Sequence, residues 1–210
     1  MKDDIGLYVI IDQGYLGKKD PVKYACRVID AGVKIIQYRA KDSRSSDYVK
    51  NAIAIARIAK KRNVKFIVND RVDIALWVNA DGVHLGADDI PAVAARKLLG
   101  SKKIIGYSTH SVREATLANK LPIDYISIGP IYYSKTKNVV HPLGCESVRK
   151  VVQRVTKPVV AIGGVDDKNV QELYNAGASG ISVISYVLGA HSMKHAVEKI
   201  NKGKINPCQG

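Results

Sequence analysis

The sequence predicts an α/β protein that folds as a single-domain (β/α)8 TIM barrel. Three observations lead to this fold class. The 210 residues, 46% of them hydrophobic, suffice for one sizeable core. Apolar runs rich in Val and Ile recur at intervals of roughly twenty to thirty residues, and nearly every interval carries a helical pattern. The runs are continuous, which is typical of parallel strands covered by helices on both faces.

Eight apolar runs are the predicted strands, at residues 7–11, 35–39, 65–69, 82–85, 104–108, 125–129, 159–162 and 180–184. Helices are expected between and after them at residues 21–32, 45–62, 90–99, 112–120, 146–155, 167–176 and 192–200. In the helix expected at 45–62, Tyr48, Ala52 and Ile55 fall on one face and the basic residues on the other, as in a helix that covers a core.

One domain is expected, with the barrel in residues 1–202 and a C-terminal tail in residues 203–210. A doubly wound open sheet is the rival fold. The chain has no G-x-G-x-x-G motif after its first strand, and an open sheet would have to hold all eight strands without a second domain. Eight βα units in one small domain therefore favour the closed barrel.

The charge balance favours an anionic partner. Thirty-three Lys and Arg face nineteen Asp and Glu, which gives a net charge of +14 and suits nucleic acid, an acidic lipid surface or phosphorylated metabolites. The basic residues are spread along the whole chain, so most of them are expected on a solvated surface.

Cysteine usage and hydropathy indicate a cytoplasmic protein. Cys26, Cys145 and Cys208 are widely separated and show neither metal-ligand spacing nor a disulfide framework. The N-terminal residues run into a short apolar strand rather than a signal peptide, and no apolar run reaches the roughly twenty residues that span a bilayer. The sequence leaves the oligomeric state open, a homo-oligomer included.

Cations follow the second strand, where a barrel enzyme gathers its active site at the carboxyl ends of the strands. The segment reads Gln37-Tyr38-Arg39-Ala40-Lys41, and strand alternation directs Gln37, Arg39 and Lys41 into the barrel mouth. A charge at the end of a buried strand needs a partner, so a functional role is favoured over a solvated surface charge.

Two acids follow the next two strands. Asp70 comes after Asn69 at the end of the third strand, and Asp89 follows the fourth. Asp70 could instead cap the helix that follows it. Taken together and surrounded by cations, the two carboxylates favour a divalent metal that carries a pyrophosphate. Asp88 is expected to be a loop or cap residue, and Asp73 and Asp81 are expected to be structural.

A second anion site is expected on the other side of the mouth. Gly163-Gly164 follows the seventh strand, where many barrels bind phosphate, and Ile184 and Ser185 of the eighth strand would close the same pocket. The loop after the sixth strand adds hydroxyls and cations, in Ser134, Lys135, Thr136 and Lys137. An enzyme that holds a pyrophosphate ester beside a phosphate ester is most simply a transferase that expels pyrophosphate.

Two histidines lie close to this mouth. His84 stands inside a strand and is expected to be an interior residue whose hydrogen bonds are satisfied. His110 stands just beyond Ser108 at the end of the fifth strand and is a weak candidate for a base.

Taken in order, the motifs of the chain resemble the thiamine phosphate synthase family over residues 7–188. These motifs are Gln37-x-Arg39-x-Lys41, Val68-Asn69-Asp70, Asp81-Gly82-Val83-His84-Leu85-Gly86, Gly106-x-Ser108-x-His110, Gly129-Pro130-Ile131-Tyr132, Ser134-x-Thr136-Lys137 and Ile162-Gly163-Gly164. The family usually has Gln where this chain has Ala87, and Thr where it has Ser134.

The resemblance implies a barrel enzyme that joins 4-amino-5-hydroxymethyl-2-methylpyrimidine pyrophosphate to 4-methyl-5-(2-hydroxyethyl)thiazole phosphate. It implies that residues 37–41 (Gln37, Tyr38, Arg39, Ala40 and Lys41), Asn69, Ser108 and Lys137 hold the pyrimidine pyrophosphate, with Arg39, Lys41, Ser108 and Lys137 as catalytic residues. Asp70 and Asp89 would bind Mg²⁺. Ser134, Lys135, Thr136, Gly164, Ile184 and Ser185 would hold the thiazole phosphate.

Two other functions are weighed against this one. A thiazole tautomerase of the same pathway shares the barrel and the Gly-x-Ser-x-His motif, but it needs neither the metal ligands nor the pyrophosphate ligands, so Asn69, Asp70 and Asp89 argue against it. A nucleic-acid-binding protein would suit the charge, yet no stacking platform or binding motif accompanies it. The expected partners are small-molecule substrates, with no nucleic acid and no membrane.

Overall fold

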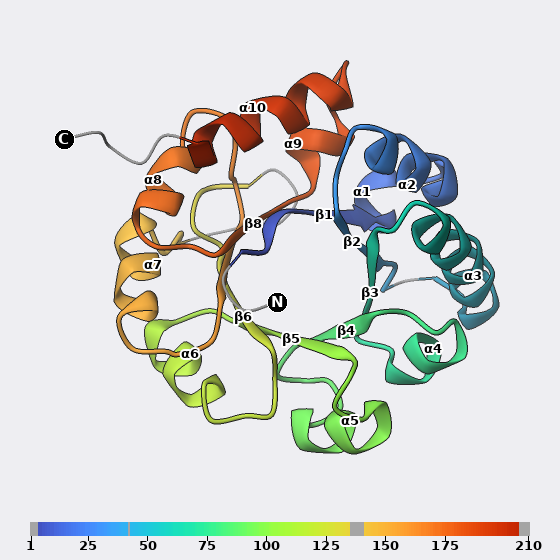
Figure 1. Cartoon of the computed structure of the whole chain (residues 1–210), viewed down its shortest axis with the longest axis horizontal. Helices are drawn as coiled ribbons and strands as arrows, with labels where there is room; N and C mark the ends of the chain where they lie inside the picture. The colour runs from blue at the N-terminus through green and yellow to red at the C-terminus, as the bar shows by residue number, and fades with distance from the viewer. Residues whose placement is uncertain (1–3, 42, 135–140, 206–210) are drawn as a thin grey trace.

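The computed structural model describes residues 4–41, 43–134 and 141–205. It is a closed barrel of parallel strands that pair in sequence order, and β8 pairs with β1 to complete it (Figure 1). The strands are β1 (Gly6–Asp12), β2 (Ile35–Arg39), β3 (Lys65–Asn69), β4 (Gly82–Leu85), β5 (Ile104–Thr109), β6 (Tyr125–Ile128), β7 (Val159–Ile162) and β8 (Gly180–Val183). The predicted barrel is confirmed, and the open sheet is excluded.

The helices form a ring around the barrel (Figure 1). They are α1 (Gln13–Leu16), α2 (Pro21–Asp30), α3 (Ser45–Lys61), α4 (Val72–Trp77), α5 (Ala92–Leu99), α6 (Val112–Ala118), α7 (Cys145–Val152), α8 (Val170–Asn175), α9 (Ser185–Leu188) and α10 (Met193–Ile205). Within the described part of the chain, no helix is both long and apolar enough to cross a membrane.

Three short helices and several element ends differ from the sequence prediction. Helices α1, α4 and α9 were not predicted, because four to six residues are too few to show a helical period. Ile184, predicted as the last residue of the eighth strand, lies just before α9, and Ser185 begins this helix. Helix α10 continues through residues 203–205, which were predicted as tail, and residues 206–210 lie outside the described part.

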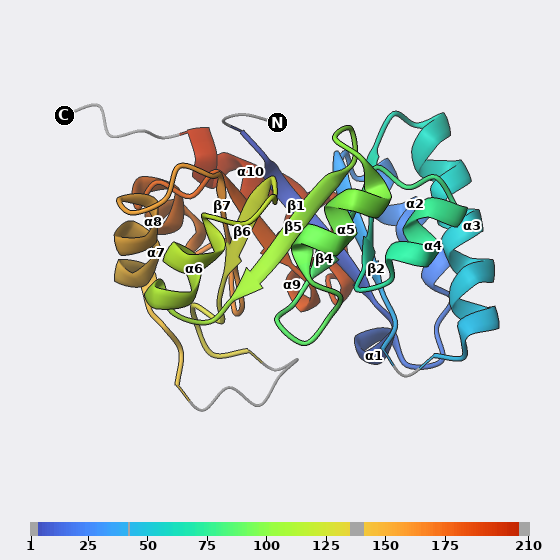
Figure 2. The same ribbon diagram turned by 90° about the horizontal axis from the view of Figure 1, so that it is seen from below.

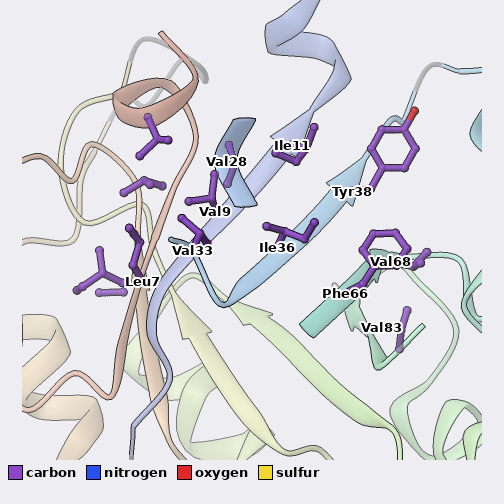
Figure 3. Packing of buried hydrophobic residues seen from close by; sticks show 14 of the residues in the cluster. Leu7, Val9, Ile11, Val28, Val33, Ile36, Tyr38, Phe66, Val68 and Val83 are labelled. Atoms are coloured by element: carbon purple, nitrogen blue, oxygen red, sulfur yellow. The ribbon is translucent and has the colours of Figure 1, made fainter. Parts of the chain in front are cut away.

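The outward faces of the strands pack against the helices. Val9, Ile36 and Val68 are fully buried in this layer, and Figure 3 shows Val28 of α2 beside Val9 of β1. Burying one such side chain contributes about 1.5–3 kcal/mol. Because this large cluster includes residues from every helix that covers the barrel, it holds the scaffold and leaves the interior of the barrel free to carry polar groups.

The interior of the barrel changes character along the strands. Near the amino ends of the strands, Ile35 and Ile67 belong to a small apolar cluster. Two residues further along the same strands, the buried residues are Gln37 and Asn69. This change gives the carboxyl half of the barrel a polar lining. In Figure 2 the arrowhead of β5 points toward the end of the barrel where α1 and α9 lie.

Candidate active site

The acid pair predicted from the sequence is formed in the structure. Asp70 and Asp89 come from the loops after β3 and β4, and their carboxyl groups lie close enough to share a hydrogen bond. Burial raises the pKa of Asp70 above its ordinary value of 3.8, and the neighbouring Asp89 raises it further, while Lys41 acts in the opposite direction. Two carboxylates held together against this cost are suited to bind a cation.

The helix-cap alternative for Asp70 is wrong. Arg71 occupies the position before α4, and no side chain caps that helix. Asp70 has a left-handed backbone with φ of 62°, and its N–H donates to the carbonyl of His84 at 2.8 Å. A non-glycine residue in this region stores strain, which persists where the surrounding structure requires it. The carboxylate is therefore held at the mouth by the backbone rather than by a helix end.

The loop that carries Asp89 is closed by this acid. The N–H of Gly86 donates to Asp89 Oδ2 at 2.7 Å. Ala87, which replaces the usual Gln of the family, is exposed and contributes no side-chain hydrogen bond to this closure. Asp88 is exposed, as expected for a loop residue. Asp89 thus keeps a defined position despite the substitution.

The remaining acids near this site have the structural roles predicted for them. Asp73 forms an ion pair with Arg71 at 2.5 Å. Asp81 accepts the N–H of Phe66 at 2.9 Å and pairs with Lys65 at 3.2 Å. Neither joins the acid pair.

The cations at the end of β2 have acidic partners. Lys41 Nζ lies 3.3 Å from Asp70 Oδ2, and Arg39 Nη1 lies 2.7 Å from Asp12 Oδ2. Asp12, at the end of β1, is buried and was missed in the sequence analysis. It could have been found, because it follows an apolar strand as Asp70 does. The third predicted cation, Lys137, lies outside the described residues.

Asp12 holds Arg39 in place and caps a helix at the same time. Its Oδ2 pairs with Arg39, and its Oδ1 accepts the N–H of Gly14 at 2.8 Å. We expect Asp12→Asn to keep the cap and to release Arg39, which should weaken pyrophosphate binding about tenfold. Titration calorimetry with pyrophosphate and Mg²⁺ measures this loss.

Asp20→Asn is the matched control for this variant. Asp20 also precedes a helix, and its Oδ1 accepts the N–H of Val22 at 2.8 Å. It lies outside the candidate site, so the control should bind pyrophosphate as the wild type does. Equal affinity in Asp12→Asn and the wild type would show that Asp12 does not position Arg39.

The other pyrimidine residues predicted in β2 and β3 differ in where they point. Gln37 lies inside the barrel, where its Nε2 donates to the Tyr8 hydroxyl at 2.6 Å. Asn69 is also buried, at the end of β3. Tyr38 points the opposite way, and its ring packs against Tyr48 of α3 with 4.8 Å between centroids. Its side chain lies away from the mouth, so only its backbone can serve a ligand there.

Ala40 follows β2 and is buried among the hydrophobic residues of the outer layer. It supplies no polar side chain, so any contact it makes with a ligand is through its backbone. Its place in the predicted segment is therefore to connect Arg39 to Lys41.

A cavity of about 330 Å³ lies over the carboxyl ends of β5 to β8. It brings together residues that the sequence assigned to both substrates. Its lining includes Ser108, Ser134, Gly164, Ile184 and Ser185. The acid pair and the β2 cations do not line this cavity, so the mouth has an acidic and cationic side over β1 to β4 and a hydroxyl-rich side over β5 to β8. Lys135 and Thr136 lie outside the described residues.

Gly163 and Gly164 both have positive φ, of 100° and 66°. A Cβ at Gly164 would overlap the backbone carbonyl of Tyr133, so close approach of the loop after β6 requires a glycine here. The backbone N–H groups of Gly164 and Ser185 meet no backbone acceptor among the described residues. Both groups are therefore available to an anion in the cavity.

The two histidines have different environments. His84 is buried, and its ring nitrogens lie 2.8 Å from the hydroxyls of Tyr125 and Ser108, which confirms the predicted interior role. His110 is exposed at the edge of the cavity, and its Nδ1 lies 3.5 Å from Glu114 Oε2. Glu114, in the first turn of α6, is therefore a partner for His110.

Comparisons with known proteins identify the family of the chain. Residues 7–187 match the family model described as thiamine monophosphate synthase. The chain belongs to the thiamine monophosphate synthase family. Members of this family include the thiamine-phosphate synthase of Persephonella marina, which is 40% identical over 197 residues, with 94% of each chain covered. That of Lawsonia intracellularis is 40% identical over 200 residues, with 95% of this chain and 92% of the relative covered.

Solved structures support the same assignment. The thiamine phosphate pyrophosphorylase from Pyrococcus furiosus is 34% identical, with a TM-score of 0.85 over 97% of this chain and 96% of that chain. An orotidine 5'-phosphate decarboxylase from Pyrococcus horikoshii, at 16% identity and a TM-score of 0.68, covers 96% of this chain and 100% of its own, and shares the fold alone. As a member of the thiamine monophosphate synthase family, the protein is a transferase that acts on small molecules.

Proposed function

We propose that this member of the thiamine monophosphate synthase family joins 4-amino-5-hydroxymethyl-2-methylpyrimidine pyrophosphate to 4-methyl-5-(2-hydroxyethyl)thiazole phosphate and releases pyrophosphate. The observation that carries the proposal is the two-sided mouth. Acids and cations gather over β1 to β4, and a cavity lined by hydroxyls and glycines lies over β5 to β8. One side suits a pyrophosphate with its metal, and the other suits a phosphate ester.

The acid pair fits Mg²⁺. Both ligands are hard carboxylate oxygens, and burial, together with the neighbouring Asp89, raises the pKa of Asp70 in spite of Lys41, so a bound cation would relieve the cost of its charge. Mg²⁺ usually takes only one or two protein carboxylates together with substrate phosphate oxygens, so Asp70 and Asp89 suffice. When bound, the metal would neutralise charge on the departing pyrophosphate.

The residues of the chain perform binding and orientation. Arg39 and Lys41 would hold the oxygens of the pyrophosphate, and Lys137 would add a third cation. An aminopyrimidine can donate electrons to expel pyrophosphate from its methylene carbon, which leaves a delocalised cation for the thiazole nitrogen to capture. Such a step depends on leaving-group stabilisation and orientation more than on a strong base. No general base is assigned, because this step does not require one.

The thiazole phosphate would lie in the cavity. Ser134, Gly164 and Ser185 line it, and Ile184, between β8 and α9, lines it as well. Lys135 and Thr136 belong to the same predicted set. The thiazole nitrogen would thus approach the pyrimidine from the β5 to β8 side of the mouth.

A coupled assay that follows pyrophosphate release tests the proposal. We expect release only when both substrates and Mg²⁺ are present. Asp89→Ala should lose most of this activity while remaining folded by circular dichroism. Release of pyrophosphate without the thiazole phosphate would point to hydrolysis instead of transfer.

The tautomerase alternative predicts a different activity. It would appear as isomerisation of the thiazole carboxylate phosphate without Mg²⁺, and His110→Ala would abolish it. The contact between His110 Nδ1 and the Glu114 carboxylate is the one observation that favours it. The Asp70–Asp89 pair has no role in that reaction.

A further inference from the structure

One buried hydroxyl in the wall of the cavity over β5 to β8 has no partner in the described protein. Ser182 of β8 has 2% of its surface exposed, and it lines this cavity. Its Oγ meets no hydrogen-bonding group among the described residues. Gln13 Oε1 and the Tyr174 hydroxyl are also buried without a partner there, but neither residue lines the cavity. Ser182 is therefore the unpartnered group that a ligand in the cavity can reach.

The strand directs this hydroxyl into the barrel. Ile181 and Val183, on either side of Ser182, belong to the outer hydrophobic layer, so the side chain between them points inward. Its neighbour across the sheet is Ile162 of β7, which lines the same cavity. The deep part of the cavity thus offers an apolar wall and one hydroxyl, which is a typical composition for a site that binds a ring.

The unpartnered hydroxyl costs stability in the free protein, because burial removes its hydrogen bonds to water. Thr109, which also lines the cavity, avoids this cost, since its hydroxyl donates to the carbonyl of Ser127 at 2.9 Å. An alanine at position 182 would avoid it too. A ligand that brings a hydrogen-bonding atom to Ser182 would recover the cost, so the hydroxyl favours ligands that carry such an atom.

The position of Ser182 fits the ring end of a phosphate ester. The N–H of Ser185 is available to an anion at the mouth, and Ser182 lies deeper on the chain segment that leads to it. From Ser182 to Ile184, where the strand has ended and α9 is about to begin, the extended chain covers about 7 Å. A ring that stands two carbons beyond its phosphate reaches from the mouth toward this depth.

We propose that Ser182 is a specificity-determining residue whose hydroxyl forms a hydrogen bond with a ring heteroatom of the phosphate ester in the cavity. Resting on the proposed function, this ester is the thiazole phosphate, whose ring supplies a nitrogen and a sulfur. Ile162 packs against the ring, and Ser182 distinguishes a heteroaromatic ring from a hydrocarbon ring. Because no described group fixes its proton, the hydroxyl can turn away when the ring nitrogen attacks the pyrimidine.

The stability of the ligand-free protein tests whether the hydroxyl is unpartnered. Ser182→Ala removes a buried polar group that makes no hydrogen bond, so its melting temperature should equal or exceed that of the wild type. Ser179→Ala is the matched control, because Ser179 precedes β8 and its Oγ accepts the N–H of Val159 at 3.4 Å. The control should melt below Ser182→Ala. A lower melting temperature for Ser182→Ala than for the wild type, or its failure to fold, would overturn the proposal.

Calorimetry with three ligands tests the contact itself. Ser182→Ala should bind the thiazole phosphate about fivefold more weakly than the wild type does, the value of one hydrogen bond. Phenylethyl phosphate has the same two-carbon linker and no ring heteroatom, so it should bind both proteins equally, as should inorganic phosphate. Ser179→Ala should bind all three ligands as the wild type does. Equal affinity of Ser182→Ala and the wild type for the thiazole phosphate, or an equal loss for all three ligands, would overturn the proposal.

The binding data and the coupled assay separate this proposal from the proposed function. The expected fivefold loss together with no release of pyrophosphate would reject the proposed function and leave the ring contact. Pyrophosphate release from both substrates, together with unchanged binding of the thiazole phosphate to Ser182→Ala, would reject the ring contact alone. A wild type that binds inorganic phosphate and not the thiazole phosphate would reject both.

Discussion

Asp70→Asn is expected to remove nearly all metal-dependent activity and, at the same time, to stabilise the metal-free protein. The carboxylate of Asp70 is disfavoured by burial and by Asp89, which together raise its pKa. A neutral amide of the same shape relieves both costs. It also removes one of the two proposed ligands of Mg²⁺, so the rate of pyrophosphate release should fall by at least about 100-fold.

The pH dependence of this stabilisation has a definite sign. A raised carboxyl pKa means that the folded protein binds the proton more tightly than the unfolded chain does. The corresponding stability is fully present below 3.8 and is lost as the pH rises through the raised pKa. Asp70→Asn does not lose it, so the melting temperature of the variant should exceed that of the wild type above that pKa and match it more closely in acid.

Thermal unfolding with and without Mg²⁺ measures both effects. Mg²⁺ should raise the melting temperature of the wild type and leave that of Asp70→Asn unchanged, because the ion stabilises only a protein that binds it. Asp88→Asn is the matched control, since Asp88 is an exposed acid in the same loop as Asp89. Stabilisation of Asp70→Asn by Mg²⁺ to the wild-type extent would remove Asp70 from the metal site.

Gly106→Ala is expected to destabilise the interior of the barrel strongly. The added methyl group would overlap the ring and hydroxyl of Tyr125 and would contact His84, and none of these groups can move freely in a packed interior. Overpacking of this kind costs about 1–3 kcal/mol of unfolding free energy. Because His84 contacts the hydroxyls of both Tyr125 and Ser108, activity should fall with stability.

Urea denaturation measures the loss, and Gly86→Ala is its control. A Cβ at Gly86 would meet nothing closer than the Asp89 carboxylate at 3.4 Å, which is an ordinary contact. Its unfolding free energy should therefore stay within about 0.5 kcal/mol of the wild type. Equal stability of Gly106→Ala and Gly86→Ala would mean that the Tyr125 ring can relocate.

The strands could be predicted well from the sequence, and the reason is physical. Most of the strands are buried on both faces and read as short apolar runs rich in Val and Ile, and the predicted and observed bounds agree within one residue. The same feature hides where β8 ends, because Ile184 continues its apolar run. Only the structure shows that the chain turns at Ile184 and begins α9 at Ser185.

Individual residues of the candidate site could be predicted from the sequence, but the hydrogen bonds between them could not. The acid pair could be inferred because carboxyl ends of neighbouring parallel strands meet at one edge. The hydrogen bonds of Tyr8, His84 and Tyr125 inside the barrel could not be inferred, because strands buried on both faces do not reveal which residues face inward. Tyr38 and Tyr8 look alike in the sequence, yet one packs against α3 and the other lies inside the barrel.

The close contact between Gly106 and the Tyr125 ring restricts which substitutions this barrel can accept over evolutionary time. The tyrosine fills the space that the glycine leaves, so position 106 cannot gain a side chain while Tyr125 stays in place. A descendant with a larger residue at position 106 must first accept a smaller one at position 125, and it would then lose the hydroxyl that orients His84. The two positions are therefore expected to be inherited together, and a designer who repacks this interior must treat them as one unit.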